Sequence, residues 1–306
     1  MWNILICTSS FNKKNINKKF LNKNFKIKYN PYGRKLTEKE VYNLIDKKTV
    51  AIISGTEKIS KKILNKADNL QIISRCGTGT DNIDKFLLNS HIKIYKTDKE
   101  PVLAVAEFVV AQILGNLKEI YYHNLNLRKK KWTKIKGKML YKNKVGIIGY
   151  GKVGKKIKSF LKPFKCEVNI YDKYIKKFSN KKILTKLLKN SNIVTLNIPL
   201  SFKNKYFINK GKLNLMKKDA VLINCSRGEL IDEVALLDHL KRNENFKAIL
   251  DCFQNEPYNG PLCNQNNVIL SPHIASFTDE TRNLMEQNSF LNCVKNIDLK
   301  KLSEKN

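Results

Sequence analysis

Short apolar runs of β type alternate with longer helical patterns along nearly the whole chain, and this alternation limits the possible folds more than any other feature. Strands that alternate with helices indicate doubly wound parallel sheets with helices on both faces. Two such series are present, so we predict two α/β domains, in a chain of 306 residues that exceeds the usual size of one hydrophobic core. The predicted strands span residues 3–8, 50–54, 71–75 and 92–95, and then 144–149, 167–171, 193–197, 220–224, 246–251 and 268–270.

The helical patterns suggest how the two domains are connected. Helices are predicted at 38–46 and 60–67 in the first series, and a strong helix at 101–118 lies between the two series. One further helix, at 279–296, is too short to form a third domain, so we expect it to pack on the first. The predicted domains are therefore a discontinuous one, residues 1–98 plus 277–306, and a continuous one, residues 99–276.

The net charge of +33 would by itself suggest a nucleic acid or an anionic membrane as partner. Only six of the 59 basic residues are Arg, however, and the Lys excess accompanies abundant Asn and Ile throughout the chain. That pattern indicates a compositional bias and not a binding surface, so we expect neither a nucleic acid nor a membrane as partner. A nucleic-acid-binding protein is the less favoured alternative. A cationic surface would still attract small anionic substrates.

Hydropathy and cysteine usage narrow the class further. The longest apolar stretch, residues 102–114, contains Glu107 and Gln112 and is too short to span a bilayer. No basic segment precedes the apolar run at the N-terminus, so we expect a cytoplasmic protein. The seven cysteines form no CxxC pair and only four histidines are present, so we expect no metal site.

A glycine motif, G-x-G-x-x-G, follows the predicted strand at 144–149 and precedes a helical pattern. Gly149 permits a tight turn, Gly151 allows backbone N–H groups to approach a pyrophosphate, and Gly154 allows a helix to pack closely on the strand. The next predicted strand ends before Asp172, 18 residues after Gly154, where a carboxylate binds the ribose hydroxyls of a dinucleotide. The acid favours NAD over NADP, although Lys173 beside it weakens that preference.

Three reactive residues follow predicted strands of the second series. Arg227 follows the strand at 220–224, Glu256 the strand at 246–251, and His273 the strand at 268–270. The carboxyl ends of parallel strands line the crevice that also holds the dinucleotide, so we expect these side chains to meet there. These residue types suit the oxidation of a 2-hydroxy acid. His273 would take the hydroxyl proton while the Glu256 carboxylate binds the other ring nitrogen, and the forked guanidinium of Arg227 would bind the substrate carboxylate.

With these segments the sequence resembles the D-isomer-specific 2-hydroxyacid dehydrogenases over nearly the whole chain. The resemblance lies in residues 73–84, 104–108, 149–154, 224–236, 251–257 and 271–275. Within the family, residues 30–37 and 54–56 look like the phosphoglycerate dehydrogenase-like branch. The resemblance implies a flavodoxin-like substrate-binding domain, a Rossmann NAD domain with NAD as cofactor, and a homodimer formed through the NAD domains near residues 105–117.

The resemblance also implies roles for individual positions. The catalytic residues would be Arg227, Glu256 and His273. The cofactor-binding residues would be Gly149, Gly151, Lys152, Val153, Gly154, Asp172, Pro199, Cys225 and Asp251, with Asp251 beside the nicotinamide carboxamide and Pro199 against the adenine. The substrate carboxylate would be held by the backbone of Cys76, Gly77, Thr78 and Gly79.

Together these features predict an NAD-dependent dehydrogenase of a small D-2-hydroxy acid, with D-3-phosphoglycerate and 3-phosphohydroxypyruvate as the leading pair. A glyoxylate or hydroxypyruvate reductase with the same three catalytic residues is the closest alternative. A non-catalytic NAD-sensing protein on the same fold is another. The chain ends soon after Asn296, so we expect no C-terminal regulatory domain.

Overall fold

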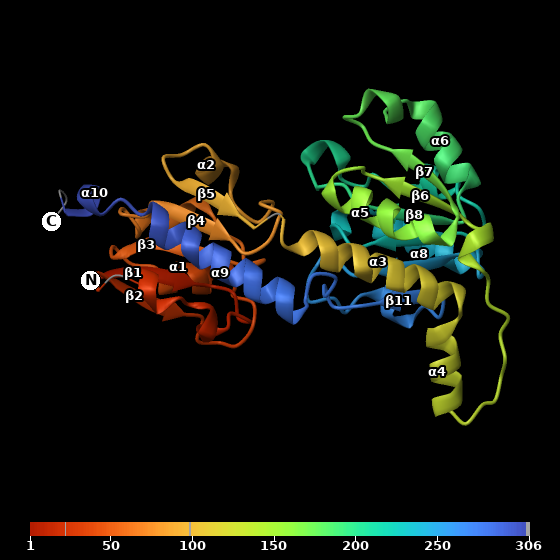
Figure 1. Ribbon diagram of the computed structural model, residues 1–306, viewed down its shortest axis with the longest axis horizontal. Coiled ribbons are helices and arrows are strands. Elements are labelled where there is room, and N and C mark those ends of the chain that lie inside the picture. The colour runs from red at the N-terminus through yellow and green to blue at the C-terminus, as the bar shows by residue number, and fades with distance from the viewer. Residues whose placement is uncertain (22, 98, 304–306) are drawn as a thin grey trace. The chain divides into compact units, whose positions relative to one another are not determined.

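The computed structural model describes residues 1–21, 23–97 and 99–303 and contains two compact units (Figure 1). Unit 1 comprises Met1–Pro101 and Thr278–Asn306, and unit 2 comprises Val102–Phe277. The predicted domain boundary falls at Asp98, which lies outside the described residues. Each unit contains one fully parallel sheet, so the prediction of two doubly wound α/β domains is confirmed.

The sheet of unit 1 has five parallel strands in the order β2-β1-β3-β4-β5. This is the flavodoxin-like order, in which the chain reverses direction across the sheet between β1 and β3. One strand, β2, was absent from our prediction. The strands are β1 (Trp2–Ile6), β2 (Phe25–Tyr29), β3 (Thr49–Ser54), β4 (Ile72–Arg75) and β5 (Lys93–Lys96).

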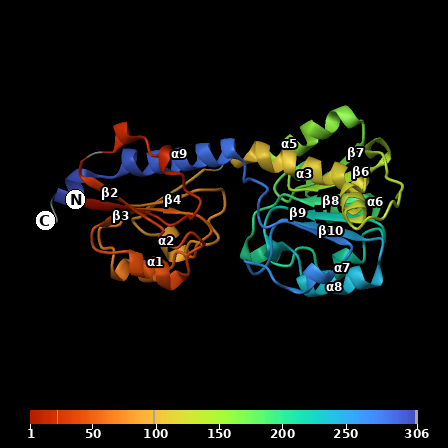
Figure 2. The same ribbon diagram turned by 90° about the horizontal axis from the view of Figure 1, so that it is seen from below.

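Helices cover both faces of this sheet, as Figure 2 shows. The long helix α9 (Asp279–Asn296) lies on one face, where Met285 and Phe290 pack into a core with strand residues. The shorter helices α1 (Glu38–Leu44) and α2 (Lys85–Leu88) lie on the other face. The helix predicted at 60–67 is a short 3₁₀ helix, η3 (Lys61–Asn65). The remaining helical turns of unit 1 are η1 (Lys13–Asn15), η2 (Lys18–Phe20) and α10 (Leu299–Ser303).

The sheet of unit 2 has six parallel strands in the order β11-β10-β9-β8-β6-β7. The direction of winding reverses between β6 and β8, which is where doubly wound sheets bind their ligands. In the described chain β7 is an edge strand, so the sheet lacks the third strand that the usual dinucleotide-binding order places beyond it. The strands are β6 (Lys144–Ile148), β7 (Glu167–Tyr171), β8 (Ile193–Leu196), β9 (Val221–Asn224), β10 (Lys247–Leu250) and β11 (Val268–Leu270).

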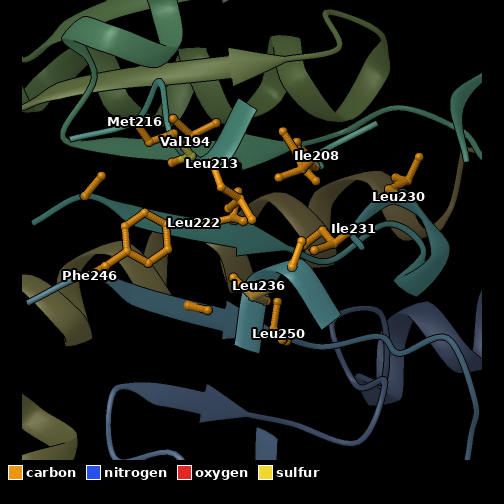
Figure 3. Packing of buried hydrophobic residues seen from close by; sticks show 14 of the residues in the cluster. Val194, Ile208, Leu213, Met216, Leu222, Leu230, Ile231, Leu236, Phe246 and Leu250 are labelled. Carbon is orange, nitrogen blue, oxygen red and sulfur yellow. The ribbon is translucent and has the colours of Figure 1, made fainter. Parts of the chain in front are cut away.

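Two hydrophobic cores hold helices on the faces of the second sheet. Helices α3 (Pro101–Leu117) and α5 (Lys152–Leu161) pack on one face. Helices α6 (Lys181–Asn190), α7 (Lys210–Leu213) and α8 (Glu233–Arg242) pack on the other. Figure 3 shows this second core, in which Leu213, Leu236 and the fully buried Phe246 surround the strand residue Leu222.

Helix α4 (Ile120–Arg128) differs from the other helices of unit 2 because none of its residues is buried. It begins after Glu119, which has a positive φ of 54°, and residues 127–139 are exposed. Figure 1 shows the chain after α4 as a long loop that leads back to β6. In the described part of the chain no single helix has the length and hydrophobicity of a membrane span, and α3 and α4 meet that test only as a pair bent by 62°. The 3₁₀ turns of unit 2 are η4 (Leu140–Lys142), η5 (Lys162–Phe164), η6 (Lys176–Phe178), η7 (Phe202–Asn204), η8 (Gly228–Leu230) and η9 (Pro261–Asn264).

Candidate active site

Three adjacent strands of unit 2 deliver the predicted catalytic residues to one edge of the sheet. In the register of the parallel pairs, Leu250 at the end of β10 lies opposite Asn224 on β9 and Leu270 on β11. The loops that follow these three residues therefore leave the sheet side by side. They carry the catalytic candidates Arg227, Glu256 and His273.

His273 and Glu256 are in direct contact. His273 Nδ1 lies 2.9 Å from Glu256 Oε1 and 3.0 Å from Oε2, and both side chains are partly exposed. A carboxylate only accepts hydrogen bonds, so Nδ1 carries the proton and Nε2 is the nitrogen that can exchange one. The Glu256 carboxylate also accepts a hydrogen bond from the Phe253 backbone N–H at 3.2 Å, which holds it within its own loop.

The Arg227 loop is fixed by hydrogen bonds from two neighbouring strands. The side chain of the fully buried Asn224 accepts from the Ser226 N–H at 3.1 Å and donates to the Arg227 carbonyl at 2.8 Å. The Ser226 hydroxyl donates to the Leu196 carbonyl at the end of β8. These bonds hold the backbone of the loop from which the Arg227 side chain extends.

The Arg227 loop and the Glu256 loop also pack against each other. A Cβ atom added to Gly228 would lie 1.9 Å from the Phe253 carbonyl carbon and 2.3 Å from the Gln254 nitrogen. Only glycine permits backbone segments to approach this closely. The residue after Arg227 and the turn that precedes Glu256 therefore form one packed structure.

The glycine motif after β6 forms a backbone cradle at the start of α5. Gly149 has a φ of 95°, a region that side chains disfavour, and a Cβ on Gly154 would lie 2.1 Å from the Gly149 carbonyl oxygen. A Cβ on Gly151, in contrast, would meet nothing within 4 Å, so space is open over the residue that caps the helix. Lys152 and Val153 are the first residues of that helix. An open space at a ten-residue helix N-terminus fits a dinucleotide pyrophosphate.

Asp172 directly follows β7, which pairs with β6, the strand that precedes the glycine motif. Its carboxylate accepts hydrogen bonds from the Tyr150 N–H at 2.7 Å and the Tyr174 N–H at 2.8 Å. These bonds connect the acid to the residue between Gly149 and Gly151 and fix its orientation. Each carboxylate oxygen can accept more than one hydrogen bond, so the acid can also bind ribose hydroxyls.

Two other predicted cofactor residues follow the next strands in the sheet. Pro199 follows β8, and its carbonyl accepts a hydrogen bond from the Asn204 side chain at 2.7 Å. Cys225 directly follows β9, and burial raises the pKa of its thiol well above the usual value. The thiol is therefore neutral, and Cys225 can contribute only its backbone and an uncharged surface. Asp251, predicted beside the nicotinamide, is almost fully buried next to the His273 loop.

The predicted substrate loop belongs to unit 1, where it follows β4. Gly77 has a φ of 140°, and its N–H donates to the Thr97 hydroxyl at 2.7 Å. No described residue accepts a hydrogen bond from the backbone N–H of Thr78 or Gly79. Cys76 before them is buried, and burial raises the pKa of its thiol, so the loop offers neutral backbone donors for an anion.

Sequence reasoning missed the residues that hold these loops in place. Asn224 and Ser271 act through hydrogen bonds to backbone and to a buried carboxylate, and Gly228 acts through close packing. A polar residue that ends an otherwise apolar strand was the available signal for Asn224. Nothing in the sequence indicated the packing of Gly228.

Comparison with known proteins identifies the family. Residues 110–275 match the family model described as D-isomer specific 2-hydroxyacid dehydrogenase, NAD binding domain. The chain is also 32% identical to the glyoxylate reductase of Pyrococcus furiosus over 250 residues, which cover 76% of this chain and 74% of that protein. The chain belongs to the D-isomer specific 2-hydroxyacid dehydrogenase family. The resemblance stated from the sequence is thus confirmed.

Other members of the family differ in substrate. The D-3-phosphoglycerate dehydrogenase of Methanocaldococcus jannaschii is 31% identical over 258 residues, covering 81% of this chain and 49% of that protein. This chain thus spans about half the length of that curated relative. The fold is shared with the solved D-lactate dehydrogenase of Aquifex aeolicus, complexed with NAD and lactic acid, at a TM-score of 0.79, 23% identity and coverage of 96% and 94% of the two chains.

Proposed function

We propose that this protein is an NAD-dependent oxidoreductase that interconverts a small D-2-hydroxy acid and its 2-keto acid by hydride transfer. The contact between His273 Nδ1 and the Glu256 carboxylate carries the proposal, because it prepares the imidazole for acid–base chemistry. Membership of the family and the match of residues 110–275 to its NAD binding domain support the same reaction. These points favour an enzyme over an NAD-sensing protein.

Each of the three side chains has a distinct part in the proposed mechanism. In the reduction of a keto acid, His273 begins protonated and donates the Nε2 proton to the oxygen that becomes a hydroxyl. In the oxidation, Nε2 accepts that proton. The Glu256 carboxylate stabilises the imidazolium through Nδ1, and Arg227 binds the carboxylate and the carbonyl oxygen of the substrate with its forked donors. Bound NAD supplies the hydride chemistry.

We assign the cofactor to the edge of unit 2 where the glycine cradle and Asp172 lie. The open space over Gly151 and the carboxylate of Asp172 support a pyrophosphate and a ribose at these two points. The residues that would hold NAD are Gly149, Gly151, Lys152, Val153, Gly154, Asp172, Pro199 and Cys225. Asp251 would lie close to its nicotinamide.

The proposed substrate pair is D-3-phosphoglycerate and 3-phosphohydroxypyruvate, bound through the backbone of residues 76–79. Similarity to the phosphoglycerate dehydrogenase of M. jannaschii supports this choice. A glyoxylate or hydroxypyruvate reductase is the second candidate. Similarity to the glyoxylate reductase of P. furiosus supports this second candidate, because the chain covers 74% of that protein.

The test is NADH oxidation by the purified protein with 3-phosphohydroxypyruvate, hydroxypyruvate, glyoxylate and pyruvate, each repeated with NADPH. We expect turnover with NADH and the highest kcat/KM for the phosphorylated acid, and the His273→Asn variant controls for background oxidation. Preference for glyoxylate or hydroxypyruvate would keep the mechanism and select the second candidate. Binding of NADH without turnover of any acid would favour a sensor.

We further propose a cytoplasmic homodimer formed through unit 2. All seven cysteines lie in the described chain and none forms a disulfide, which suits a reducing compartment. Exposed apolar side chains on and after α4, among them Leu125, Leu127 and Trp132, provide a surface for a second copy. Much of α3, the helix expected at the interface, is buried in its own unit, and Leu103 is its exposed large apolar residue.

A further inference from the structure

Asp251, which follows β10, carries the most deeply buried carboxylate in the described part of unit 2. The residue is 1% exposed. Its Oδ1 accepts hydrogen bonds from the Ser271 hydroxyl at 2.6 Å and the Ile274 N–H at 2.8 Å, and its Oδ2 accepts from the Ala275 N–H at 2.8 Å. All three donors belong to the loop that carries His273.

These three hydrogen bonds flank His273 on both sides in the sequence. His273 itself has a φ of 56°, a left-handed conformation that is unfavourable for a residue with a side chain. A conformation of this kind persists only where the surroundings determine it. The Asp251 carboxylate contributes to that determination, since it holds the Ser271 hydroxyl two residues before the histidine and the backbone N–H groups one and two residues after it.

The energetics of Asp251 point the same way. Burial raises the pKa of its carboxyl, while the hydrogen bonds from Ser271, Ile274 and Ala275 favour the charged form. Burying a carboxylate is unfavourable unless hydrogen bonds compensate for the lost water. Here every hydrogen bond that the carboxylate accepts from the described chain comes from the His273 loop. The negative charge of Asp251 therefore stabilises the conformation of the His273 loop.

We propose that Asp251 is a positioning residue that holds the His273 imidazole in place for Glu256 and for the substrate. The inference rests on the proposed acid–base function of His273, and it adds to Asp251 a role separate from contact with the nicotinamide. Asp251 does not touch the reacting atoms in this role. It acts through the Ser271 hydroxyl and the backbone N–H groups of Ile274 and Ala275.

The variant Asp251→Asn tests the proposal because it keeps the size of the side chain and replaces one acceptor oxygen with a donor. The amide then faces a backbone N–H or the Ser271 hydroxyl, so at least one of the three hydrogen bonds is lost. Since a displacement of about 1 Å reduces catalysis by about 100-fold, we expect kcat to fall by about 10- to 100-fold. The Kd for NADH, measured by fluorescence, should change by a smaller factor than kcat does.

Hydrogen–deuterium exchange provides a readout that does not need activity. We expect faster exchange at the amides of residues 271–277 in Asp251→Asn and unchanged exchange in β6 and α5. Ser271→Ala keeps the carboxylate and removes one hydrogen bond, so it should show smaller changes in the same direction if Asp251→Asn folds poorly. Asp232→Asn is the matched control, because Asp232 also accepts a backbone N–H, from Ala235 at the start of α8, and should leave kcat and loop exchange unchanged.

The outcomes separate this proposal from the proposed function. An unchanged loop exchange in Asp251→Asn, with a large loss of NADH affinity, would assign the residue to the cofactor and overturn the positioning role. Faster loop exchange with unchanged kcat would also overturn it. If the wild-type protein turned over no keto acid, the proposed function would fail, whereas the exchange data would still decide whether Asp251 holds the loop.

Discussion

The two ring nitrogens of His273 have different surroundings, and this difference sets their parts in the proposed mechanism. Nδ1 is held by the Glu256 carboxylate, which leaves Nε2 for proton exchange. We therefore expect His273→Ala to lower kcat by about 10²–10⁴-fold, because proton transfer is lost. NADH affinity, measured by fluorescence titration, should remain close to that of the wild type. Full activity of the variant would rule out His273 as the acid–base residue.

Asp172 combines two tasks at the cofactor edge, since it holds the Tyr150 and Tyr174 backbone N–H groups and carries the charge that would disfavour a 2′-phosphate. Asp172→Ala should raise the KM for NADH and narrow the difference between NADH and NADPH. Steady-state kinetics with both cofactors measure this change. Asp219→Asn, a surface carboxylate paired with Lys138, is the control. An unchanged cofactor preference in Asp172→Ala would contradict the ribose assignment.

Part of the candidate site could be predicted from the sequence and part could not, for a physical reason. Asp172 and His273 could be placed at one edge of the sheet because each follows an apolar strand, and the ends of parallel strands share one edge. The hydrogen bonds from Ser271 to Asp251 and the contact of Gly228 with Phe253 depend on loop geometry, which no periodicity encodes.

Among the strands, those with an apolar run were predictable from the sequence even at the edges of a sheet, as β7 and β11 show. The predictions at 167–171 and 268–270 agree with β7 and β11 residue for residue. β2, with the sequence FKIKY, escaped prediction because its lysines alternate with apolar residues and resemble the Lys-rich surroundings. Strand order was also beyond the sequence, since it depends on which face each connecting helix packs against.

Helix α8 contains a titratable group that links stability to pH. His239 is buried, its Nε2 has no hydrogen-bond partner among the described residues, and its ring packs edge-on against Phe246 at 4.6 Å. Burial, with a smaller effect of Arg242, lowers the pKa of this imidazole from its usual value of 6.5. The unfolded chain therefore binds a proton at a higher pH than the folded chain does.

The sign of the effect follows from that difference. The stability that neutral His239 contributes is fully present above pH 6.5 and is lost as the pH falls through the lowered pKa. We expect the urea midpoint to decrease more between pH 7 and pH 5 in the wild type than in His239→Leu, as measured by circular dichroism. Equal decreases in both proteins would exclude His239 as the source.

On the scale of the whole molecule, the exposed surface of α4 and the residues after it leads to a prediction about assembly. Trp132 is 81% exposed and Leu125 is 52% exposed, which is unusual for side chains of this size. We expect light scattering to give twice the chain mass of 35.4 kDa. The double variant Leu125→Asp, Trp132→Ala should shift the protein towards monomer.

A matched control for assembly is Tyr174→Ala, because Tyr174 is 87% exposed and lies on another part of unit 2. Loss of the dimer in this variant as well would show that apolar exposure alone does not define the interface. A wild-type monomer at micromolar concentration would contradict the proposed assembly.

The contact of Gly228 with Phe253 and Gln254 has a consequence for how this protein could be redesigned or could evolve. Any larger residue at position 228 would separate the loops that carry Arg227 and Glu256, so neither loop can change its course without the other. Mutations that adapt the protein to a new keto acid must therefore fall elsewhere. Sequence diversity is better introduced outside these two loops, where it leaves Arg227, Glu256 and the packing at Gly228 intact.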